Sequence, residues 1–320
     1  MEILQTCLKK YYYNYVDKRK REKTVPVDLA LGLYFHKIVE LYWVKEAPGV
    51  LRPKYKSKEK FINASLGYYK RFIVSTDKIQ GKKIEWRDEN QKWILLNSVL
   101  PKVLSDYHDL TQTEAPPLGV EVQFKISLDD TLLVGRIDEL RKSPNGLTIR
   151  DHKFYRYKIP KDMEKDFNLQ FTIYALTLTL DLKNYGDMSK AIGLSREESL
   201  ALSGNNLISK SIGLEYHLLN TNQIIPATRE DMHFLDIKTT IEGLKEKLRS
   251  GQESGNYYHE RGSHCDFCLN KKICRQDTLE NRIDDGQTKL ELFPIDSQFI
   301  KKPRKNKSQI RIKFPKDKKE

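Results

Sequence analysis

The sequence contains no apolar run of the roughly eighteen residues that a membrane-spanning helix requires, so it predicts no transmembrane segment. Its first stretch, MEILQTCLKKYYYNYVDKRKREK, has no uninterrupted apolar core of the kind found in secretory signals, and we expect a cytoplasmic protein with no membrane partner. A GxxxxGK(S/T) phosphate loop is also absent, which excludes a recognisable ATP motor in this chain. Cysteine is scarce, with four in 320 residues, and a reducing compartment favours metal ligation over disulfide bonds.

Positive charge is in excess and is unevenly distributed. The formal net charge is +13, and residues 301–320 carry ten Lys or Arg against two Asp or Glu. Such a tail is either a solvated, disordered segment or a flexible arm that binds polyphosphate, and the composition fits both equally. Residues 9–23 mix tyrosines with cations, which suits stacking on nucleic-acid bases, but helix packing would use the same tyrosines.

Hydrophobic periodicity predicts a helical first part and a β-rich middle. We expect a helix over residues 28–46, capped by Asp28, and a mostly helical segment after it, with Trp86 and Trp93 in the core. Three consecutive antiparallel strands follow at 121–128, 131–140 and 147–155, then a helix with an apolar stripe of Leu169, Ile173, Leu176 and Leu180. Further strands are expected at 212–220 and 223–230, and a helix at 229–249.

The hairpin of residues 134–153, VGRIDELRKSPNGLTIRDHK, brings acidic groups together. If its Pro-Asn dipeptide is the centre of the turn, Asp138 lies directly opposite Asp151, with Cβ atoms about 4.5–5.5 Å apart. Lys153 follows two residues later, on the same face of its strand. A bulge in the turn would shift this register by one residue.

Two adjacent carboxylates repel each other unless a cation lies between them, and a hard ion such as Mg²⁺ or Mn²⁺ removes the conflict. Such an ion polarises a phosphoryl oxygen and lowers the pKa of a bound water, while Lys153 orients that water or neutralises developing charge. The combination suits phosphodiester hydrolysis. By spacing alone, an Asp-Lys salt bridge on a solvated strand face would be commoner.

Other motifs accompany this hairpin in a fixed order. GLYFHKIVE places a histidine on a helix, GRID ends one strand, DHK lies on the next strand and QFTIY opens a helix. This order resembles the RecB-like branch of the PD-(D/E)XK nuclease superfamily, which includes CRISPR-associated exonucleases and the nuclease domains of helicase-nuclease repair complexes. The resemblance covers residues 28 to about 275, and the conjunction is more specific than any single motif.

Carried onto this sequence, the resemblance implies that His36, Asp138 and Asp151 are metal ligands. The backbone carbonyl of His152 is implied as a fourth ligand, and Lys153 as the catalytic lysine. The implied ion is Mg²⁺ or Mn²⁺.

The same resemblance implies that Gln170 and Tyr174 form the family's glutamine-tyrosine pair. Four residues apart, they share one face of a helix and are placed to position Lys153 or the DNA strand. Outside the family context, His36 would more often be a core histidine and Tyr174 a core tyrosine. Glu121, at the start of the first strand, is expected to be structural or to support the ligands from behind.

The cysteines follow a one-plus-three layout. Cys265, Cys268 and Cys274 lie in HCDFCLNKKIC, and Cys7 stands alone near the N-terminus. Spacing does not distinguish iron from zinc; for zinc, His264 or His259 is available as a further ligand. RecB-like nucleases often hold a 4Fe-4S cluster with this layout, so the resemblance implies a structural cluster on all four cysteines, with zinc as the lesser alternative.

We therefore expect an α/β protein with a restriction-endonuclease-like mixed sheet flanked by helices. The expected regions are a helical part with the first cysteine and the histidine (1–115), a nuclease core (116–228), a helix and cysteine segment (229–280) and a basic tail (281–320).

The expected function is metal-dependent hydrolysis of DNA, as an exonuclease acting on single strands or free ends in repair, recombination or phage DNA metabolism. A closed ring around the site would favour threading of a free end. The alternatives are a non-catalytic DNA-binding subunit of a helicase-nuclease complex and a structure-specific endonuclease. A helicase or recombination partner is compatible with the missing phosphate loop.

Overall fold

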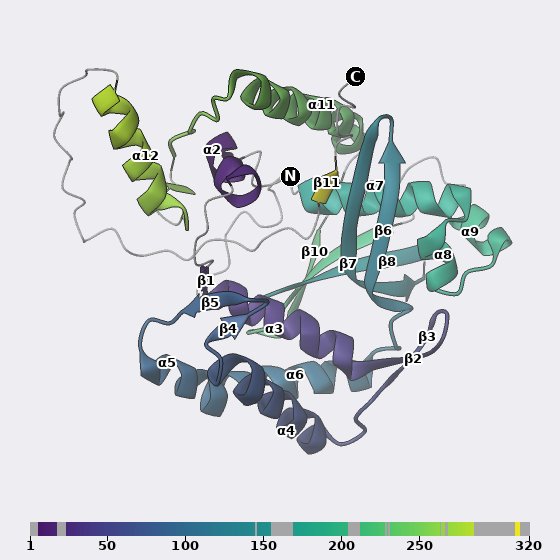
Figure 1. Cartoon of the computed structure of the whole chain (residues 1–320). Helices are drawn as coiled ribbons and strands as arrows, with labels where there is room; N and C mark the ends of the chain where they lie inside the picture. Colours follow the sequence, from purple (N-terminus) through teal and green to yellow (C-terminus); the bar gives the residue numbers. More distant parts are fainter. Residues whose placement is uncertain are drawn as a thin grey trace.

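A six-stranded mixed sheet lies at the centre of the chain (Figure 1). The computed structural model describes residues 6–17, 24–144, 146–154, 169–203, 212–227, 229, 231–262, 264–265, 268–284 and 311–313. The strands are β6 (Gly119–Leu128), β7 (Thr131–Ser143), β8 (Gly146–Lys153), β9 (Ile212–Leu218), β10 (Gln223–Ala227) and β11 (Arg311–Lys313). Their order is β10-β9-β8-β7-β11, and β6 also pairs with β7. Because β8 and β9 are parallel and the other pairs antiparallel, the sheet is mixed, as predicted.

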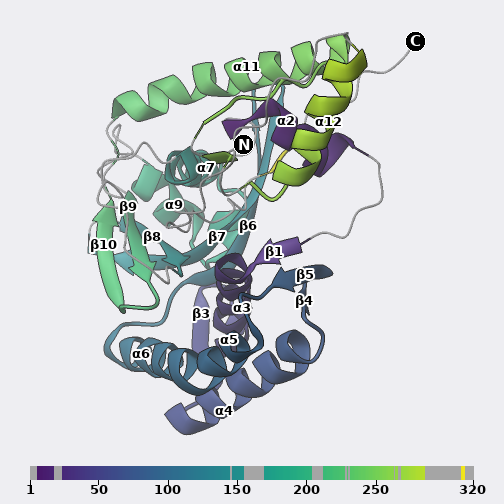
Figure 2. The same cartoon turned by 90° about the vertical axis from the view of Figure 1, so that its left-hand side faces the viewer.

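Two hydrophobic cores meet at the end of β8. The first packs α7 (Leu169–Asn184), α8 (Asp187–Ala191) and α11 (Asp231–Ser254) against β6 to β9, with α9 (Arg196–Ser203) next to α7. The second contains α3 (Val27–Tyr42), α4 (Lys58–Tyr69) and α6 (Leu100–Thr113), and it includes Phe154, directly after β8. Figure 2 shows these helices below the sheet and α11 above it. The strand that carries Asp151 and Lys153 therefore ends between the two cores.

Short elements complete the helical part. They are β1 (Thr24–Pro26), β2 (Trp43–Ala47), β3 (Val50–Pro53), β4 (Lys78–Ile79), β5 (Lys82–Glu85), α5 (Glu89–Ile94) and the π-helical segments η1 (Tyr12–Val16), η2 (Lys70–Val74) and η3 (Leu95–Val99). β2 and β3 form a hairpin, and β1, β5 and β4 form a small sheet at the start of α3.

The N-terminal segment packs against the C-terminal part of the chain. α2 (Leu8–Tyr11) lies next to α11, on the side of the molecule where α12 (Lys271–Asp284) also lies (Figures 1 and 2). Leu8 is buried with Leu244, Leu248 and Tyr257, and the Lys9 N–H donates to the Tyr258 carbonyl. The rings of Tyr12 and Tyr257 are 4.8 Å apart, so these N-terminal tyrosines serve packing. Tyr15, at 59% exposed, is the exception.

The predicted three-stranded meander, the two later strands and the helix near 229–249 are confirmed by β6 to β10 and α11. Two details are wrong, and one is incomplete. The helix predicted over 28–46 begins at Val27 and ends at Tyr42, with Asp28 in its first turn instead of at its cap, and the chain then continues as β2. Trp93 is 51% exposed because it lies on the outer side of the short helix α5. The predicted stripe on α7 is only part of a helix that is buried on most sides.

The remaining expectations concern other parts of the chain. Of the basic tail at 281–320, residues 285–310 and 314–320 lie outside the described residues, as do residues 18–23 of the basic and aromatic stretch. Among the described helices, none has both the length and the apolar composition needed to cross a bilayer.

Candidate active site

The predicted register of the hairpin is confirmed. The paired residues of β7 and β8 run from Ser143 with Gly146 to Glu139 with Arg150. One residue further from the turn, the same register brings Asp138 opposite Asp151. At this position the Asp138 side chain contacts the neighbouring strand: its Oδ2 accepts a hydrogen bond from the His152 N–H at 2.9 Å. Asp138 and Asp151 are each 1% exposed, so two buried carboxylates lie next to each other at the end of β8.

Glu121, in β6, is a third acidic residue beside Asp138. The pairs Val120 with Glu139 and Val122 with Ile137 flank Glu121, which places it opposite Asp138. Glu121 has a left-handed backbone, with φ of 50°, and this conformation costs a non-glycine residue about 1–3 kcal/mol. The interruption of the strand turns the glutamate side chain toward the helix α3.

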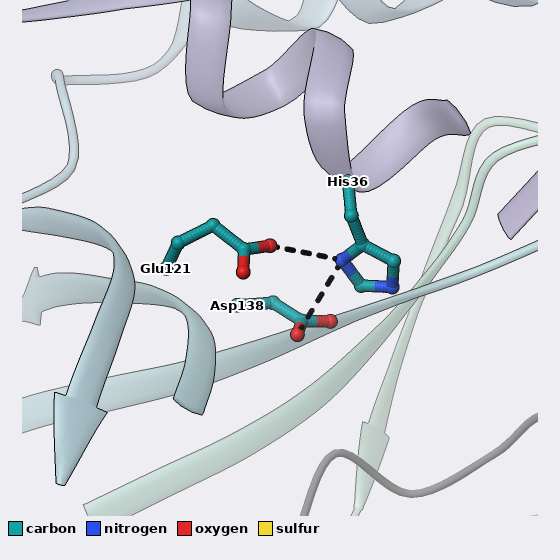
Figure 3. Close-up of side chains that lie close together, drawn as sticks. All are labelled: His36, Glu121 and Asp138. Atoms are coloured by element: carbon teal, nitrogen blue, oxygen red, sulfur yellow. Dashed lines mark hydrogen bonds and ion pairs between the residues drawn. The ribbon is translucent and has the colours of Figure 1, made fainter. Parts of the chain in front are cut away.

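His36 of α3 completes the group (Figure 3). Its Nδ1 lies 3.1 Å from Glu121 Oε1 and 3.5 Å from Asp138 Oδ1. One ligand atom from each of His36, Glu121 and Asp138 lies within 4.8 Å of the other two, a spacing that a single metal ion can bridge. The helix lies far from the two strands in sequence, so the group depends on the tertiary fold.

Asp151 is held by the residues of the family motif. Lys153 Nζ lies 2.5 Å from Asp151 Oδ2, and Gln170 Nε2 donates to Asp151 Oδ1 at 2.9 Å. Gln170 also donates to Tyr174 Oη at 2.7 Å and accepts from Lys153 at 3.3 Å. The first turn of α7 therefore fixes the carboxylate and the ammonium of β8 relative to each other.

Three carboxylate oxygens in this site are buried and accept no hydrogen bond from the described residues: Glu121 Oε2, Asp138 Oδ1 and Asp151 Oδ2. Each is instead next to a cation, Arg136, His36 and Lys153 respectively. Buried anionic oxygens that face positive charge without a hydrogen bond fit the coordination of a hard divalent ion, which Mg²⁺ and Mn²⁺ satisfy.

These neighbours change the ionisation of the site. Burial opposes protonation of His36, but the carboxylates of Asp138 and Glu121 outweigh it and raise the histidine pKa to about 9. Burial raises the pKa of Asp151 to about 6, since the charge of Asp138 adds to it and Lys153 only partly compensates. Burial also raises the pKa of Tyr174 well above its ordinary value, so the tyrosine is a neutral hydrogen-bonding group.

The side chain of His152 belongs to a separate buried chain of polar groups. Its Nε2 is 3.1 Å from Glu139 Oε2, and its Nδ1 is 3.1 Å from His217 Nδ1. His217 Nε2 is 3.0 Å from Asn222 Oδ1, and Asn222 Nδ2 donates to the Asp106 carbonyl. With Asn222 in this orientation, His217 donates from Nε2 and accepts at Nδ1.

His152 therefore donates from Nδ1 to His217, and its other ring nitrogen faces Glu139. Burial, together with the neighbouring His152, lowers the pKa of His217 to about 3, which agrees with a neutral acceptor. Burial alone would raise the pKa of Glu139, but its hydrogen bond from His152 and the charges of Arg150 and Arg141 hold it well below its usual range.

The four cysteines, all among the described residues, form no disulfide bond; Cys7 is buried and Cys265, Cys268 and Cys274 are half-buried. Burial raises the pKa of the Cys268 and Cys274 thiols, and the charge of Cys7 raises both further. Tyr13 Oη donates to Asp277 of α12, and Asn270 donates to Asn14, so the segment that carries Cys7 packs against the segment that carries the other three cysteines.

The two histidines considered as zinc ligands are engaged elsewhere. His264 Nε2 is 2.8 Å from the Glu260 carbonyl oxygen, and His259 Nε2 accepts from Arg261.

Most residues of the predicted site lie close together, but Glu121 and not Asp151 belongs to the group of three that can bridge one ion. Asp151 lies beside the group, bound by Lys153, whereas Glu121 lies within 4.8 Å of His36 and Asp138. We expected Glu121 to be structural or supporting. A signal was present in the sequence: a two-residue Asp-Asp turn after Leu128 sets a register that places Glu121 opposite Asp138.

A mixed sheet whose neighbouring strands bring carboxylates and a lysine to one buried point, with a histidine from a helix, is the arrangement of a metal-dependent phosphodiester hydrolase. The chain belongs to the PD-(D/E)XK nuclease superfamily, whose family model matches residues 1–275. A comparison with curated proteins finds no match. The superfamily as a whole consists of nucleases and related hydrolases that use Mg²⁺ or Mn²⁺.

Proposed function

We propose that this chain is a metal-dependent DNA exonuclease of the RecB-like branch, with a structural 4Fe-4S cluster. The observation that carries the proposal is the convergence of His36, Asp138, Asp151 and Lys153 from one helix and two adjacent strands. A buried cluster of acids and a lysine costs folding energy, because each charge loses its hydration, and we take its presence as a sign of function. The branch, the exonuclease activity and the cluster are inferences from this chain's residues and motif order.

The divalent ion would be held by His36, Asp138 and Asp151, with Glu121 as an additional ligand and the His152 carbonyl as the backbone donor. When bound, Mg²⁺ or Mn²⁺ supplies Lewis acidity and lowers the pKa of a water molecule. Hydrolysis of a phosphodiester bond requires both effects.

The protein groups around this position have separate tasks. Lys153 places a positive charge beside Asp151, where it neutralises charge that develops on the phosphate or orients the attacking water. Gln170 keeps the lysine and the carboxylate in register. Tyr174 holds the Gln170 amide through a neutral hydroxyl.

The cysteines support a larger cluster more than a zinc ion. A tetrahedral zinc site with sulfur ligands at about 2.3 Å needs thiols roughly 3.8 Å apart. Among the described residues, the atoms that meet within 4.8 Å as a group of three come from His36, Glu121 and Asp138, and no cysteine belongs to that group. A cluster held by four thiolates would join the N-terminal segment to α12 and keep the chain closed around the site, which favours a free DNA end.

The proposal can be tested with labelled single strands in linear and circular form. We expect Mg²⁺- or Mn²⁺-dependent release of nucleotides from the linear strand, no cleavage of the circle, and loss of release in Asp138→Asn and Lys153→Met. The matched control is Asp109→Asn, an exposed aspartate on α6 paired with Lys58.

Each other outcome has a meaning. Cleavage of the circle would replace the exonuclease by an endonuclease. Strand binding without any cleavage in the intact chain would favour the non-catalytic DNA-binding subunit. Undiminished release by Asp138→Asn and Lys153→Met would overturn the assigned site. Co-purification with an ATPase would identify the helicase partner that a helicase-nuclease complex requires.

A further inference from the structure

The active site contains three pairs of an acid and a cation. His36 faces Asp138, Lys153 faces Asp151, and Arg136 faces Glu121, with 3.0 Å between Arg136 Nε and Glu121 Oε2. The proposed function uses His36 as a ligand and Lys153 as a catalytic group. Arg136 has no part in it, although it is only two residues before Asp138 in β7.

The three cations differ in their exposure. The side chain of Lys153 is 9% exposed and that of His36 18%, whereas that of Arg136 is 41% exposed. Two of the cations are therefore enclosed by protein, and the third lies at the rim, where a ligand from solvent can reach it.

Charge determines what this rim residue does when an ion binds. The carboxylate of Glu121 links the Arg136 guanidinium to the candidate metal ligands, because its Oε1 contacts His36 and its Oε2 contacts Arg136. A divalent ion that draws on Glu121 competes with Arg136 for the same carboxylate and repels the guanidinium. The arginine then needs another anion, and a nucleic-acid strand supplies phosphates at the same rim.

We propose that Arg136 binds a backbone phosphate of the DNA strand once the metal ion has taken over Glu121. The inference rests on the proposed function and adds the group that recognises the strand next to the metal. A guanidinium suits this task, since its planar fork matches two phosphate oxygens and remains charged at all relevant pH values. The residue links metal binding to substrate binding through a single shared carboxylate.

A merely structural ion pair would behave differently, and the chain contains a matched example. Arg52 in β3 pairs through its Nε with Glu46 of β2 and is 54% exposed. The two arginines share the same type of partner, the same contacting atom and similar exposure. They differ in their acids: Glu121 is 6% exposed and belongs to the candidate metal site, whereas Glu46 is 49% exposed and does not.

The experiment measures binding of a fluorescent oligonucleotide by anisotropy at several salt concentrations, in the Lys153→Met chain so that the strand stays intact. With Mg²⁺ present, Arg136→Gln should weaken binding several-fold and reduce the slope of log affinity against log salt by about 0.7, the value for one lost phosphate contact on a single strand. Arg136→Lys should restore the slope but only part of the affinity. Without Mg²⁺, the difference between Arg136→Gln and the parent chain should disappear.

Arg52→Gln should leave the slope unchanged in both conditions. Equal slopes for Arg136→Gln and Arg52→Gln in Mg²⁺ would overturn the inference, as would a lower melting temperature of Arg136→Gln without any change of slope. Absence of binding by the parent chain would also overturn it. Cleavage is scored separately in the intact chain, so the proposed function and this inference can fail independently.

Discussion

Lys153 Nζ lies 2.5 Å from Asp151 Oδ2, two residues earlier in the same strand, and this ion pair places a positive charge beside the buried carboxylate. Asp151 and Asp138 are both almost fully buried, and two such carboxylates repel each other in the absence of positive charge. The lysine therefore has two tasks, to compensate this charge and to serve the chemistry.

Replacement of Lys153 by methionine separates the two tasks. We expect kcat to fall by about 10²–10⁴-fold, the range for loss of a group that acts in proton transfer or charge stabilisation. Metal affinity should be retained or increase, because a competing cation beside Asp151 has been removed. Nucleotide release and calorimetric titration with Mn²⁺ measure the two quantities, and parallel loss of both would mean that Lys153 is mainly structural.

The histidine predicts opposite pH trends for metal binding and for stability of the metal-free chain. Because the His36 pKa is raised to about 9 and a ligand imidazole must be neutral, a proton competes with the metal below that pH. Mn²⁺ affinity should therefore increase by about tenfold per pH unit between pH 6.5 and 8.5. His36→Gln should bind more weakly and lose this dependence.

The sign for stability follows from the same shift. The pKa of His36 rises from 6.5 in the unfolded chain to about 9 in the folded one, so the folded state binds the extra proton. This stabilisation is complete below pH 6.5 and is lost as the pH rises through 9; it amounts to at most about 3 kcal/mol. Urea unfolding of the metal-free chain at a series of pH values measures it, and identical profiles for the parent and His36→Gln would contradict the assignment.

Glu121 allows the strain in β6 to be separated from its charge. Glu121→Gly and Glu121→Ala both remove the carboxylate, but only alanine keeps an unfavourable left-handed φ. We expect the glycine variant to be more stable than the alanine variant by about 1 kcal/mol, the reverse of the usual order in a strand. Both should lose affinity for Mn²⁺. A more stable alanine variant in chemical unfolding would show that the strand relaxes at this position.

The hairpin that carries Asp138 and Asp151 could be predicted from the sequence because a two-residue turn and the two-residue period of a strand determine the pairing. The turn after Leu128 likewise determines that Glu121 lies opposite Asp138, but strand alternation does not anticipate its φ of 50°. Trp93 was misplaced because large apolar residues on short helices can remain on the surface. The contact of His152 with His217 was not predictable, because it depends on how β8 and β9 come to lie side by side.

His217 tests whether the buried chain behind β8 positions the site. Replacement by phenylalanine removes the hydrogen bonds to His152 and Asn222 while keeping a ring. We expect Mn²⁺ affinity to fall by about 10–100-fold, the usual effect of losing a group that orients a metal ligand. The amide proton of His152, which binds Asp138, should also exchange faster.

The matched control is His108→Phe, since His108 is another buried histidine, in α6, that packs against Phe61. It should alter stability without a change in metal affinity. Equal losses of Mn²⁺ affinity in the two variants would assign the effect to general loosening of the fold.

A cluster on the four cysteines would join the N-terminal segment to the C-terminal part of the chain, and this link can be tested. If Cys7 and Cys274 share a 4Fe-4S cluster, anaerobic purification yields a brown protein with about four iron atoms per chain, and either serine variant loses the colour. Cys7→Ser should also make the N-terminal segment more accessible to protease, because only the packing of Leu8 and Tyr12 and a few hydrogen bonds, such as that of Tyr13 with Asp277, then hold it. A colourless protein with one zinc would keep the link between the chain ends but replace the cluster. If the protein contains no metal and its Cys7→Ser variant resists protease as well as the parent chain does, the cysteines hold no cluster. The preference for free DNA ends would then need another structural cause.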